Sequence, residues 1–232
     1  MRSDGDASIP RHATRCSGRY RAFVFDLDGT LVDSRPAIEK AAQMAIAQIV
    51  PIYRDRKVTA AIGPPIRQMF KEVFSELDAA TLELVVAAFR TAYDSDVCRE
   101  TPSYPGVPEL LARIAARGVV SFVLTNKPFA PTRQILSQLG VERHIREIVA
   151  PDSPAHPFTS KTEALDALLQ RHKLARDLTV MVGDAKDDAA AAKACGVAFA
   201  AAIYGYGGLQ PEPGRTNWLI INRPLDMLSL LE

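Results

Sequence analysis

One short segment constrains this chain more than any other. Residues 23–31 read FVFDLDGTL, an apolar and aromatic run that ends in Asp26 and Asp28. The run predicts a buried strand. Side chains two residues apart on a strand share a face, and strand ends open into ligand crevices in α/β sheets. Two such acids repel each other unless a proton or a cation compensates. Mg²⁺ prefers oxygen ligands, so the segment indicates metal-assisted chemistry on an anion.

Length and charge narrow the classes of function. The 232 residues can form one large domain or two unequal ones, and a hydrophobic share of 47% is ample for a core. Lys and Arg number 28 against 27 for Asp and Glu. This balance argues against nucleic-acid binding, which depends on a basic excess. A small phosphorylated metabolite remains a suitable partner because it needs only local positive charge.

The remaining composition indicates a cytoplasmic protein. No apolar run approaches the ~20 residues of a membrane span, so we expect no membrane partner. Residues 1–19 are polar, contain arginine and lack the apolar region of a signal peptide, and we expect a disordered tail. The widely spaced Cys16, Cys98 and Cys195 predict reduced thiols, with Cys195 buried. We expect a monomer or a homodimer.

The stretch after the first strand predicts an all-helical insertion. Asp33 to Pro36 have the form of a helix start, and apolar residues then recur at helical spacing. Pro51 and the segment 63–65 interrupt the pattern, and a third helix is expected from about Asp78. No strand pattern occurs before about residue 100, and residues 101–106 read as a return linker.

From residue 107 onward, strands and helices are expected to alternate. The expected strands are 119–124, 148–149, 178–182, 197–201 and 218–221. The expected helices are 107–117, 132–139, 161–172, an Ala-rich helix that ends at Gly196, and 224–231. Such alternation predicts an α/β fold with a doubly wound, Rossmann-like parallel sheet. The predicted domains are a core of residues 20–33 and 104–232 and a helical cap of residues 34–103.

Polar residues follow three of the expected strands. The first strand is followed by Asp26 and Asp28, the strand at 119–124 by Thr125, Asn126 and Lys127, and the strand at 178–182 by Asp184, Asp187 and Asp188. Lys161 begins a helix between the last two groups. The carboxyl ends of these strands meet in one crevice in a doubly wound sheet. The set predicts joint binding of a divalent cation and a phosphoryl group.

These motifs resemble those of the haloacid dehalogenase superfamily. Residues 26–34 resemble its first motif, 125–127 its second, Lys161 its third and 183–188 its fourth. The order and spacing of the four motifs match those of the superfamily over residues 20–232, and the helical insertion resembles the superfamily's helical cap. Residues 203–207 resemble a loop of the phosphoglycolate-phosphatase-like branch. Lys161 departs from the common pattern because Thr162, rather than proline, follows it.

The resemblance implies a role for each acid. Asp26 is expected to attack phosphorus and form an aspartyl-phosphate. Asp28 is expected to protonate the leaving group and then to activate water. Asp26, the backbone carbonyl of Asp28 and Asp184 are expected to hold Mg²⁺, with Asp188 supporting that shell.

The resemblance also implies substrate contacts. Thr125 and Asn126 are expected to hydrogen-bond the phosphoryl oxygens, and Lys161 is expected to offset their charge. Gly29 permits close approach of the backbone. Lys127 is interpreted as a solvated or loop-anchoring residue. Arg67 follows a Gly-x-Pro segment that resembles the cap loop facing the active site, so we predict that it contacts a substrate anion.

Several activities remain open at this stage. Asp28 favours phosphate esters over organohalides, because a leaving alkoxide needs a proton. A sugar-phosphate mutase is compatible with the motifs, and a phosphonate hydrolase would need a cap lysine such as Lys40, Lys57 or Lys71. A nucleoside 5′-monophosphate phosphatase could stack a base on Tyr204 or Tyr206. A silent binding module is expected to lack one of the three principal acids, yet Asp26, Asp28 and Asp184 are all present.

Overall fold

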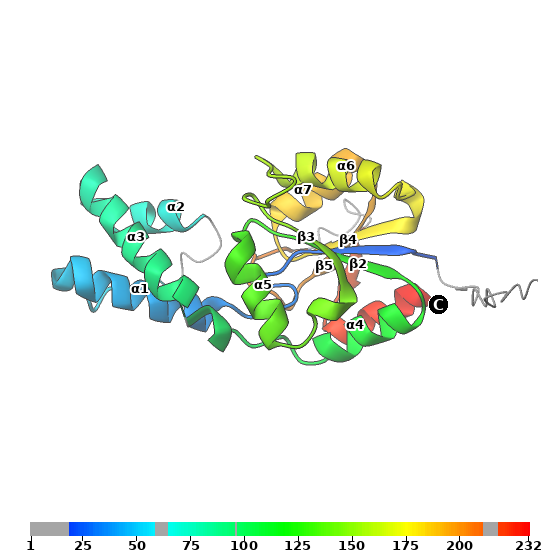
Figure 1. Cartoon of the computed structure of the whole chain (residues 1–232), viewed down its shortest axis with the longest axis horizontal. Coiled ribbons are helices and arrows are strands. Elements are labelled where there is room, and N and C mark those ends of the chain that lie inside the picture. The colour runs from blue at the N-terminus through cyan, green and yellow to red at the C-terminus, as the bar shows by residue number, and fades with distance from the viewer. Residues whose placement is uncertain (1–18, 59–64, 96, 211–217) are drawn as a thin grey trace, which may run out of the picture.

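The computed structural model describes residues 19–58, 65–95, 97–210 and 218–232, so nearly all of the predicted tail lies outside the described residues. The described chain contains one parallel sheet in the order β3-β2-β1-β4-β5-β6 (Figure 1). Its strands are β1 (Ala22–Phe25), β2 (Val120–Leu124), β3 (Ile145–Val149), β4 (Thr179–Gly183), β5 (Ala198–Ala202) and β6 (Leu219–Ile221). The prediction of a parallel sheet is confirmed.

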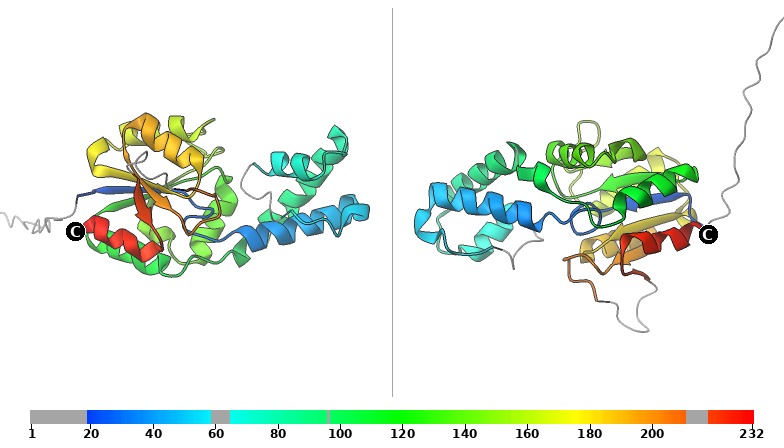
Figure 2. Two further views of the ribbon diagram at one scale, coloured as in Figure 1. Left: turned by 180° about the vertical axis from the view of Figure 1, so that it is seen from behind. Right: turned by 90° about the horizontal axis from the view of Figure 1, so that it is seen from below.

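Alternation along β1 divides the core into two layers. Phe23 and Phe25 enter one apolar cluster, and Ala22 and Val24 enter the other, as expected for a strand buried on both faces. One face is covered by α4 (Val107–Ala116), α5 (Phe129–Gln138) and the 3₁₀ segment η6 (Pro224–Leu231). The other is covered by α6 (Lys161–Arg171) and α7 (Lys186–Cys195) (Figure 2). This is the predicted doubly wound α/β fold.

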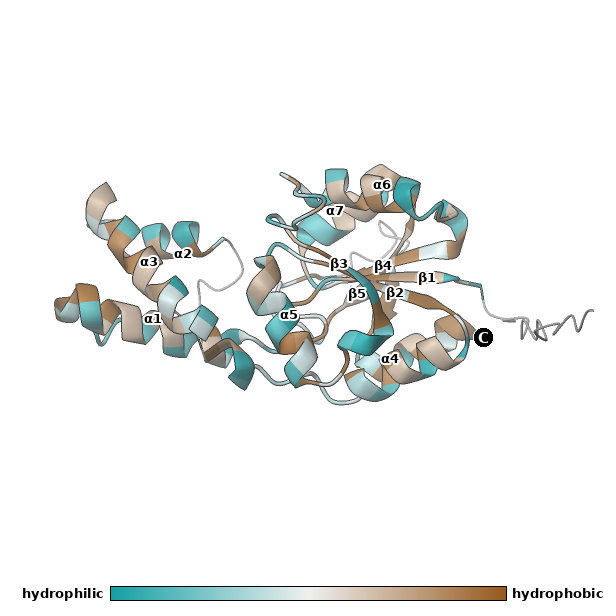
Figure 3. Cartoon of the chain, in the orientation of Figure 1, coloured by the Kyte–Doolittle hydropathy of each residue, from teal (hydrophilic) through white to brown (hydrophobic). Residues whose placement is uncertain are grey.

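The inserted segment is helical over its described residues. It contains α1 (Arg35–Ile49), η1 (Pro51–Tyr53), α2 (Ile66–Val73), α3 (Ala79–Ser95) and η3 (Val97–Glu100). Phe70 on α2 lies edge-on to Phe89 on α3, with ring centroids 5.8 Å apart. The apolar faces of these helices share the cluster that continues under the sheet, while polar residues colour much of their outer surface (Figure 3).

Two neighbouring segments join the helical unit to the sheet. The N–H of Asp33 donates to the carbonyl of Pro102 at 3.0 Å, and the N–H of Tyr104 donates to the carbonyl of Leu31 at 3.0 Å. The chain therefore leaves and re-enters the core along one short pair of strands. The predicted cap limits of 34 and 103 fall beside this pair and stay a prediction.

Two details differ from the expected elements. The strand β3 begins at Ile145, before the apolar pair Ile148 and Val149, because an edge strand tolerates the polar side chains in its first half. The final helix has 3₁₀ geometry, and its tighter turns still bury Pro224, Met227 and Leu231. Short 3₁₀ turns, η4 (Glu142–His144) and η5 (Arg176–Leu178), precede β3 and β4. Within the described residues, no helix has the length and apolar character of a membrane span.

Candidate active site

The centre of the sheet brings together two acids that are distant in sequence. Asp26 follows β1 and Asp184 follows β4, the two adjacent strands at which the strand order reverses. The N–H of Asp26 donates to the carbonyl of Val182 at 2.8 Å, which extends the pairing of β1 and β4 by one residue. Both acids are buried, with 4% and 3% of their surface exposed. The reversal point is where doubly wound sheets bind ligands.

A buried lysine joins Asp26 to a third acid. Lys161 begins α6, whose N-cap Ser160 accepts a hydrogen bond from the N–H of Glu163 at 3.2 Å. The Nζ of Lys161 lies 2.8 Å from Oδ1 of Asp26 and 2.6 Å from Oδ1 of Asp188. Asp188 is fully buried in the first turn of α7, where its Oδ2 accepts from the N–H of Ala185 at 3.1 Å.

The acids form a compact site with strong mutual repulsion. Carboxylate oxygens of Asp26, Asp184 and Asp188 all lie within 4.8 Å of one another. Burial, and to a lesser degree the charge of Asp26, raises the pKa of Asp184 to about 7. Burial also raises the pKa of Asp26 and Asp188, against the opposing effect of Lys161. A divalent cation would relieve this repulsion, so the donor set fits Mg²⁺.

Glycine residues pack tightly around Asp184. Gly29 has a φ of +84°, and a Cβ there would lie 1.9 Å from Oδ2 of Asp184. The N–H of Gly207 donates to the same oxygen at 2.7 Å. A Cβ on Gly205 would lie 2.3 Å from the carbonyl oxygen of Gly29. The loop 203–207 therefore closes over Asp184, and Gly29 is needed at least for this packing.

The residues after β2 reach the same site. Thr125 is buried, and its Oγ1 accepts from the N–H of Lys127 at 3.1 Å, which leaves the hydroxyl proton free to donate. Nδ2 of Asn126 donates to Oδ2 of Asp187 at 2.9 Å. Asp187 in turn lies 3.4 Å from the Nζ of Lys161. Both predicted phosphoryl contacts thus lie beside the acid cluster.

Asp28 has a partner that sequence reasoning missed. Of the two interpretations of Lys127, solvated or loop-anchoring, the solvated one is wrong, because only 6% of the side chain is exposed. Its Nζ lies 3.0 Å from each carboxylate oxygen of Asp28. Asp28 is partly buried, and its side chain is outside the group of three acids that could share a cation. The expected role of Asp28 in metal binding involved only its backbone carbonyl.

A cavity of about 280 Å³ connects these groups to the helical cap. From the core it is lined by the acids Asp26, Asp28 and Asp184, by residues 125–128 and by Lys161. From the cap it is lined by Ile38 on α1, Ile66 and Met69 on α2, and Phe89, Arg90, Tyr93 and Asp94 on α3. The site therefore combines a polar floor with a largely apolar cap wall.

The structure does not bring Arg67 to this cavity. Its Nε donates to Oε1 of Glu83 at 2.5 Å, and 56% of its side chain is exposed. Arg90 lines the cavity instead. The glycine and first proline of the Gly-x-Pro segment lie outside the described residues. Helical periodicity placed both arginines on the cap but gave no signal for which one faces the core.

Of the residues linked to the alternative activities, the three cap lysines do not line the cavity, whereas Tyr206 does. None of Lys40, Lys57 and Lys71 is among the residues that line the cavity, and Lys40 pairs with Glu100 at 2.6 Å on the surface. Tyr206 does line the cavity, and its hydroxyl lies 2.7 Å from Oγ of Ser34. Tyr204 donates to the carbonyl of Thr30 at 2.6 Å, which agrees with a packing role.

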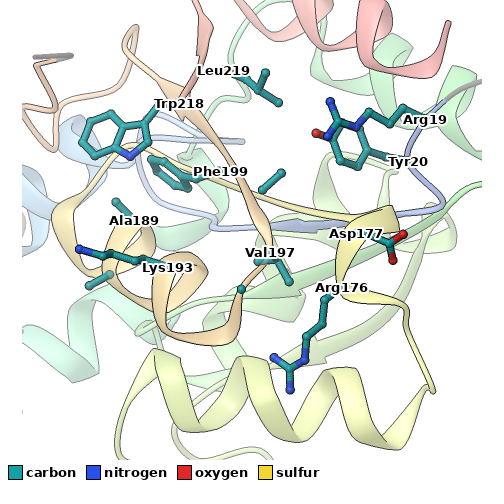
Figure 4. A pocket seen from close by; sticks show the side chains of 13 residues that line it. Arg19, Tyr20, Arg176, Asp177, Ala189, Lys193, Val197, Phe199, Trp218 and Leu219 are labelled. Carbon is teal, nitrogen blue, oxygen red and sulfur yellow. The ribbon is translucent and has the colours of Figure 1, made fainter. Parts of the chain in front are cut away.

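A larger cavity, of about 920 Å³, lies at the opposite ends of the strands (Figure 4). Its lining comes from residues that precede β1, β4, β5 and β6, among them Tyr20, Arg176 and Trp218, together with the first residues of β5 and β6 and with residues of α7. None of the predicted site residues lines it, and Asp177 is its only carboxylate among the described residues. The predicted lysine and most of the predicted acids line the smaller cavity and not the larger one.

Comparisons with known proteins identify the family of the chain. The family model described as haloacid dehalogenase-like hydrolase matches residues 23–202. The chain is 30% identical to the N-acetylmuramic acid 6-phosphate phosphatase of Pseudomonas aeruginosa, over 92% of this chain and 96% of that protein. It is 32% identical to a 5′-nucleotidase of the same organism, over 82% and 85%. It is 33% identical to the phosphoglycolate phosphatase of Rhodospirillum rubrum, over 80% of each.

A solved structure extends the agreement to the fold. A predicted phosphoglycolate phosphatase from Haemophilus somnus superimposes with a TM-score of 0.80 at 22% identity, covering 93% of this chain and 100% of the other. The predictions of the family and of its phosphoglycolate-phosphatase-like branch are confirmed, and the names of the relatives agree with the predicted class of phosphoric monoester hydrolases. The chain belongs to the haloacid dehalogenase-like hydrolase family.

Proposed function

We propose that this chain is a Mg²⁺-dependent phosphatase that hydrolyses a small phosphate monoester through an aspartyl-phosphate on Asp26. The observation that supports this most strongly is the buried group of Asp26, Asp184 and Asp188, held beside Lys161 at the floor of a cavity. A carboxylate can attack phosphorus without a separate base, because it is the ionised form that carries the lone pair.

The other residues of the site have separate roles in the proposed reaction. Lys161 donates a hydrogen bond to Asp26 and favours its charged form against the effect of burial. Thr125 donates its hydroxyl proton to a phosphoryl oxygen, and Asn126 supplies an amide beside it. Asp28 transfers a proton to the leaving oxygen and later removes one from the attacking water.

Asp26 and Asp184, with the backbone carbonyl of Asp28, would hold Mg²⁺, while Asp188 orients this shell through Lys161 and the N–H of Ala185. The cation would supply positive charge that aligns the phosphoryl oxygens with the nucleophile.

Mg²⁺ binding should depend on pH. The pKa of Asp184 is raised from 3.8 to about 7, so without a cation the folded protein binds a proton that the unfolded chain lacks. This contribution to stability is present at low pH and is lost as pH rises through about 7. Mg²⁺ replaces the proton, so it should raise the melting temperature more near pH 8 than near pH 5.5.

Thermal unfolding with Mg²⁺ or with EDTA measures this difference without any substrate. Asp184→Asn should remove most of the Mg²⁺-dependent shift near pH 8. A shift of equal size at both pH values, or one that survives in the variant, would contradict the proposed metal site.

We propose phosphoglycolate-like substrates, which carry a carboxylate beyond the ester. The cap wall of the cavity offers Arg90 as the counter-charge. Arg67 is paired with Glu83, whereas the charge of Arg90 acts on Asp94, four residues further along α3, which also lines the cavity. A nucleoside 5′-monophosphate is the second candidate, supported by the relative named a 5′-nucleotidase.

Substitution of the two cap arginines should show which of them contacts the carboxylate of a phosphoglycolate-like substrate. Arg90→Ala is expected to lower kcat/KM for 2-phosphoglycolate by about 10- to 100-fold, the range for a lost charged hydrogen bond. The same change should affect the neutral analogue 2-hydroxyethyl phosphate by less than about 3-fold. Arg67→Ala is the matched control. If Arg67→Ala lowers kcat/KM for 2-phosphoglycolate more than Arg90→Ala does, the prediction from the sequence that Arg67 contacts the substrate anion would be correct.

A further inference from the structure

A second buried lysine lies in the cavity beside the group expected to move protons. Lys127 follows β2, and its Nζ is equidistant from the two oxygens of Asp28, at 3.0 Å. Lys161 makes a separate set of contacts, with Asp26, Asp187 and Asp188. The two lysines therefore serve different acids, and the proposed mechanism above assigns a task only to Lys161.

Lys127 also contacts the cap. Its Nζ lies 4.7 Å from the centre of the Tyr93 ring, which belongs to α3. Both side chains are buried, and the geometry is that of a cation–π contact. The buried hydroxyl of Tyr93 lies near enough to Lys127 and Thr101 to interact with both, but within the described part of the chain it makes no hydrogen bond of good geometry. The ammonium thus lies between the cap and the carboxylate of Asp28.

Without this lysine, Asp28 has reason to move. Its charge acts on Asp26, and a cation held by the group of three acids would attract its carboxylate. Lys127 engages both of its oxygens and keeps it out of the acid group. In the protonated form of Asp28, the oxygen that carries the proton can turn toward a leaving group while the other accepts from the ammonium. The ammonium then stabilises the carboxylate that remains after the proton has moved to the leaving oxygen. Asp94 and Cys98 also lie near enough to interact electrostatically with Lys127.

We propose that Lys127 is a positioning residue that holds Asp28 for proton transfer to the leaving group, and that the Tyr93 ring of the cap holds Lys127 in place. The inference rests on the proposed phosphatase function. It adds a physical link by which the position of the cap reaches the reacting groups, because α3 carries Tyr93 and Asp28 belongs to the core.

The test compares two leaving groups. An alkyl phosphate releases a strongly basic alkoxide and needs the proton of Asp28, whereas p-nitrophenyl phosphate releases a stable phenolate and does not. The ratio kcat/KM reports steps up to the first irreversible one, the formation of the phosphoenzyme. Lys127→Met should lower kcat/KM for 2-phosphoglycolate about 100-fold, the lower end of the range for general acid catalysis, and for p-nitrophenyl phosphate by less than about 3-fold. Lys127→Arg should restore part of the loss.

The cap contact has its own pair of variants. Tyr93→Phe keeps the ring, so its kcat/KM for 2-phosphoglycolate should fall less than that of Tyr93→Leu. Tyr93→Leu removes the ring and should depend on the leaving group as Lys127→Met does. Its kcat/KM for 2-phosphoglycolate should fall about 10-fold. If Lys127→Met does not fold, the two Tyr93 variants still test whether Lys127 positions Asp28.

Three results distinguish the possible failures. Equal losses on both substrates in Lys127→Met and Tyr93→Leu would overturn the inference, because a contact with the phosphoryl group or general disorder affects both. Unchanged activity in both variants would overturn it as well. An unsubstituted protein that hydrolyses neither substrate would instead refute the proposed function, since Lys127 is intact in that protein.

Discussion

Asp26→Asn is expected to lower kcat for phosphate monoesters by at least about 10⁴-fold, the scale seen when a catalytic nucleophile is removed. The amide keeps the shape of the side chain but cannot form the acyl phosphate. The loss should be as large for p-nitrophenyl phosphate as for an alkyl phosphate, because both must transfer the phosphoryl group to residue 26. Steady-state hydrolysis with saturating Mg²⁺ measures the effect.

The matched control makes the same change in the other cavity. Asp177 lines the larger cavity at the opposite ends of the strands, so Asp177→Asn should leave kcat within about 2-fold. A large loss in Asp177→Asn, together with activity in Asp26→Asn, would move the chemistry to that cavity.

Lys161→Met should impair both stability and catalysis. It leaves Asp26 and Asp188 buried without their common partner, and removal of one member of a buried ion pair costs about 3–5 kcal/mol. Because the pKa of each acid then rises further, the folded variant binds more protons than the unfolded chain. Its loss of stability should therefore be larger near pH 8 than near pH 5.5. We expect kcat to fall by about 10²-fold or more.

Denaturant unfolding at the two pH values measures the stability term. Lys193→Met, an exposed lysine on α7, is the control and should change neither quantity. If Lys161→Met is as stable as the control at both pH values, Lys161 does not neutralise the buried acids.

The sequence was sufficient for the architecture because its periodicities are strong. The continuous apolar runs at Phe23-Val24-Phe25 and before Thr125 and Asp184 identify buried strands. Parallel strands in turn require that their carboxyl ends share one edge. The meeting of Asp26, Asp184 and Lys161 follows from this rule, although 135 residues separate Asp26 from Lys161.

The sequence was insufficient for side chains whose partner lies on another element. Nothing near Lys127 indicates that its ammonium reaches Asp28, because 99 residues separate the two and only the strand order β2-β1 brings them together. Arg67 and Arg90 both stand on amphipathic cap helices, and the rotation of each helix against the core decides which lines the cavity. That rotation depends on packing among α1, α2 and α3, which local patterns do not encode.

The central claim is that Asp26 receives the phosphoryl group. Acid quenching during turnover of p-nitrophenyl phosphate, followed by borohydride reduction and peptide mass spectrometry, detects an acyl phosphate by converting the modified aspartate into homoserine. We expect homoserine at residue 26 alone, in a yield that depends on Mg²⁺. Turnover with an unmodified residue 26, or homoserine at another acid such as residue 184, would contradict the account.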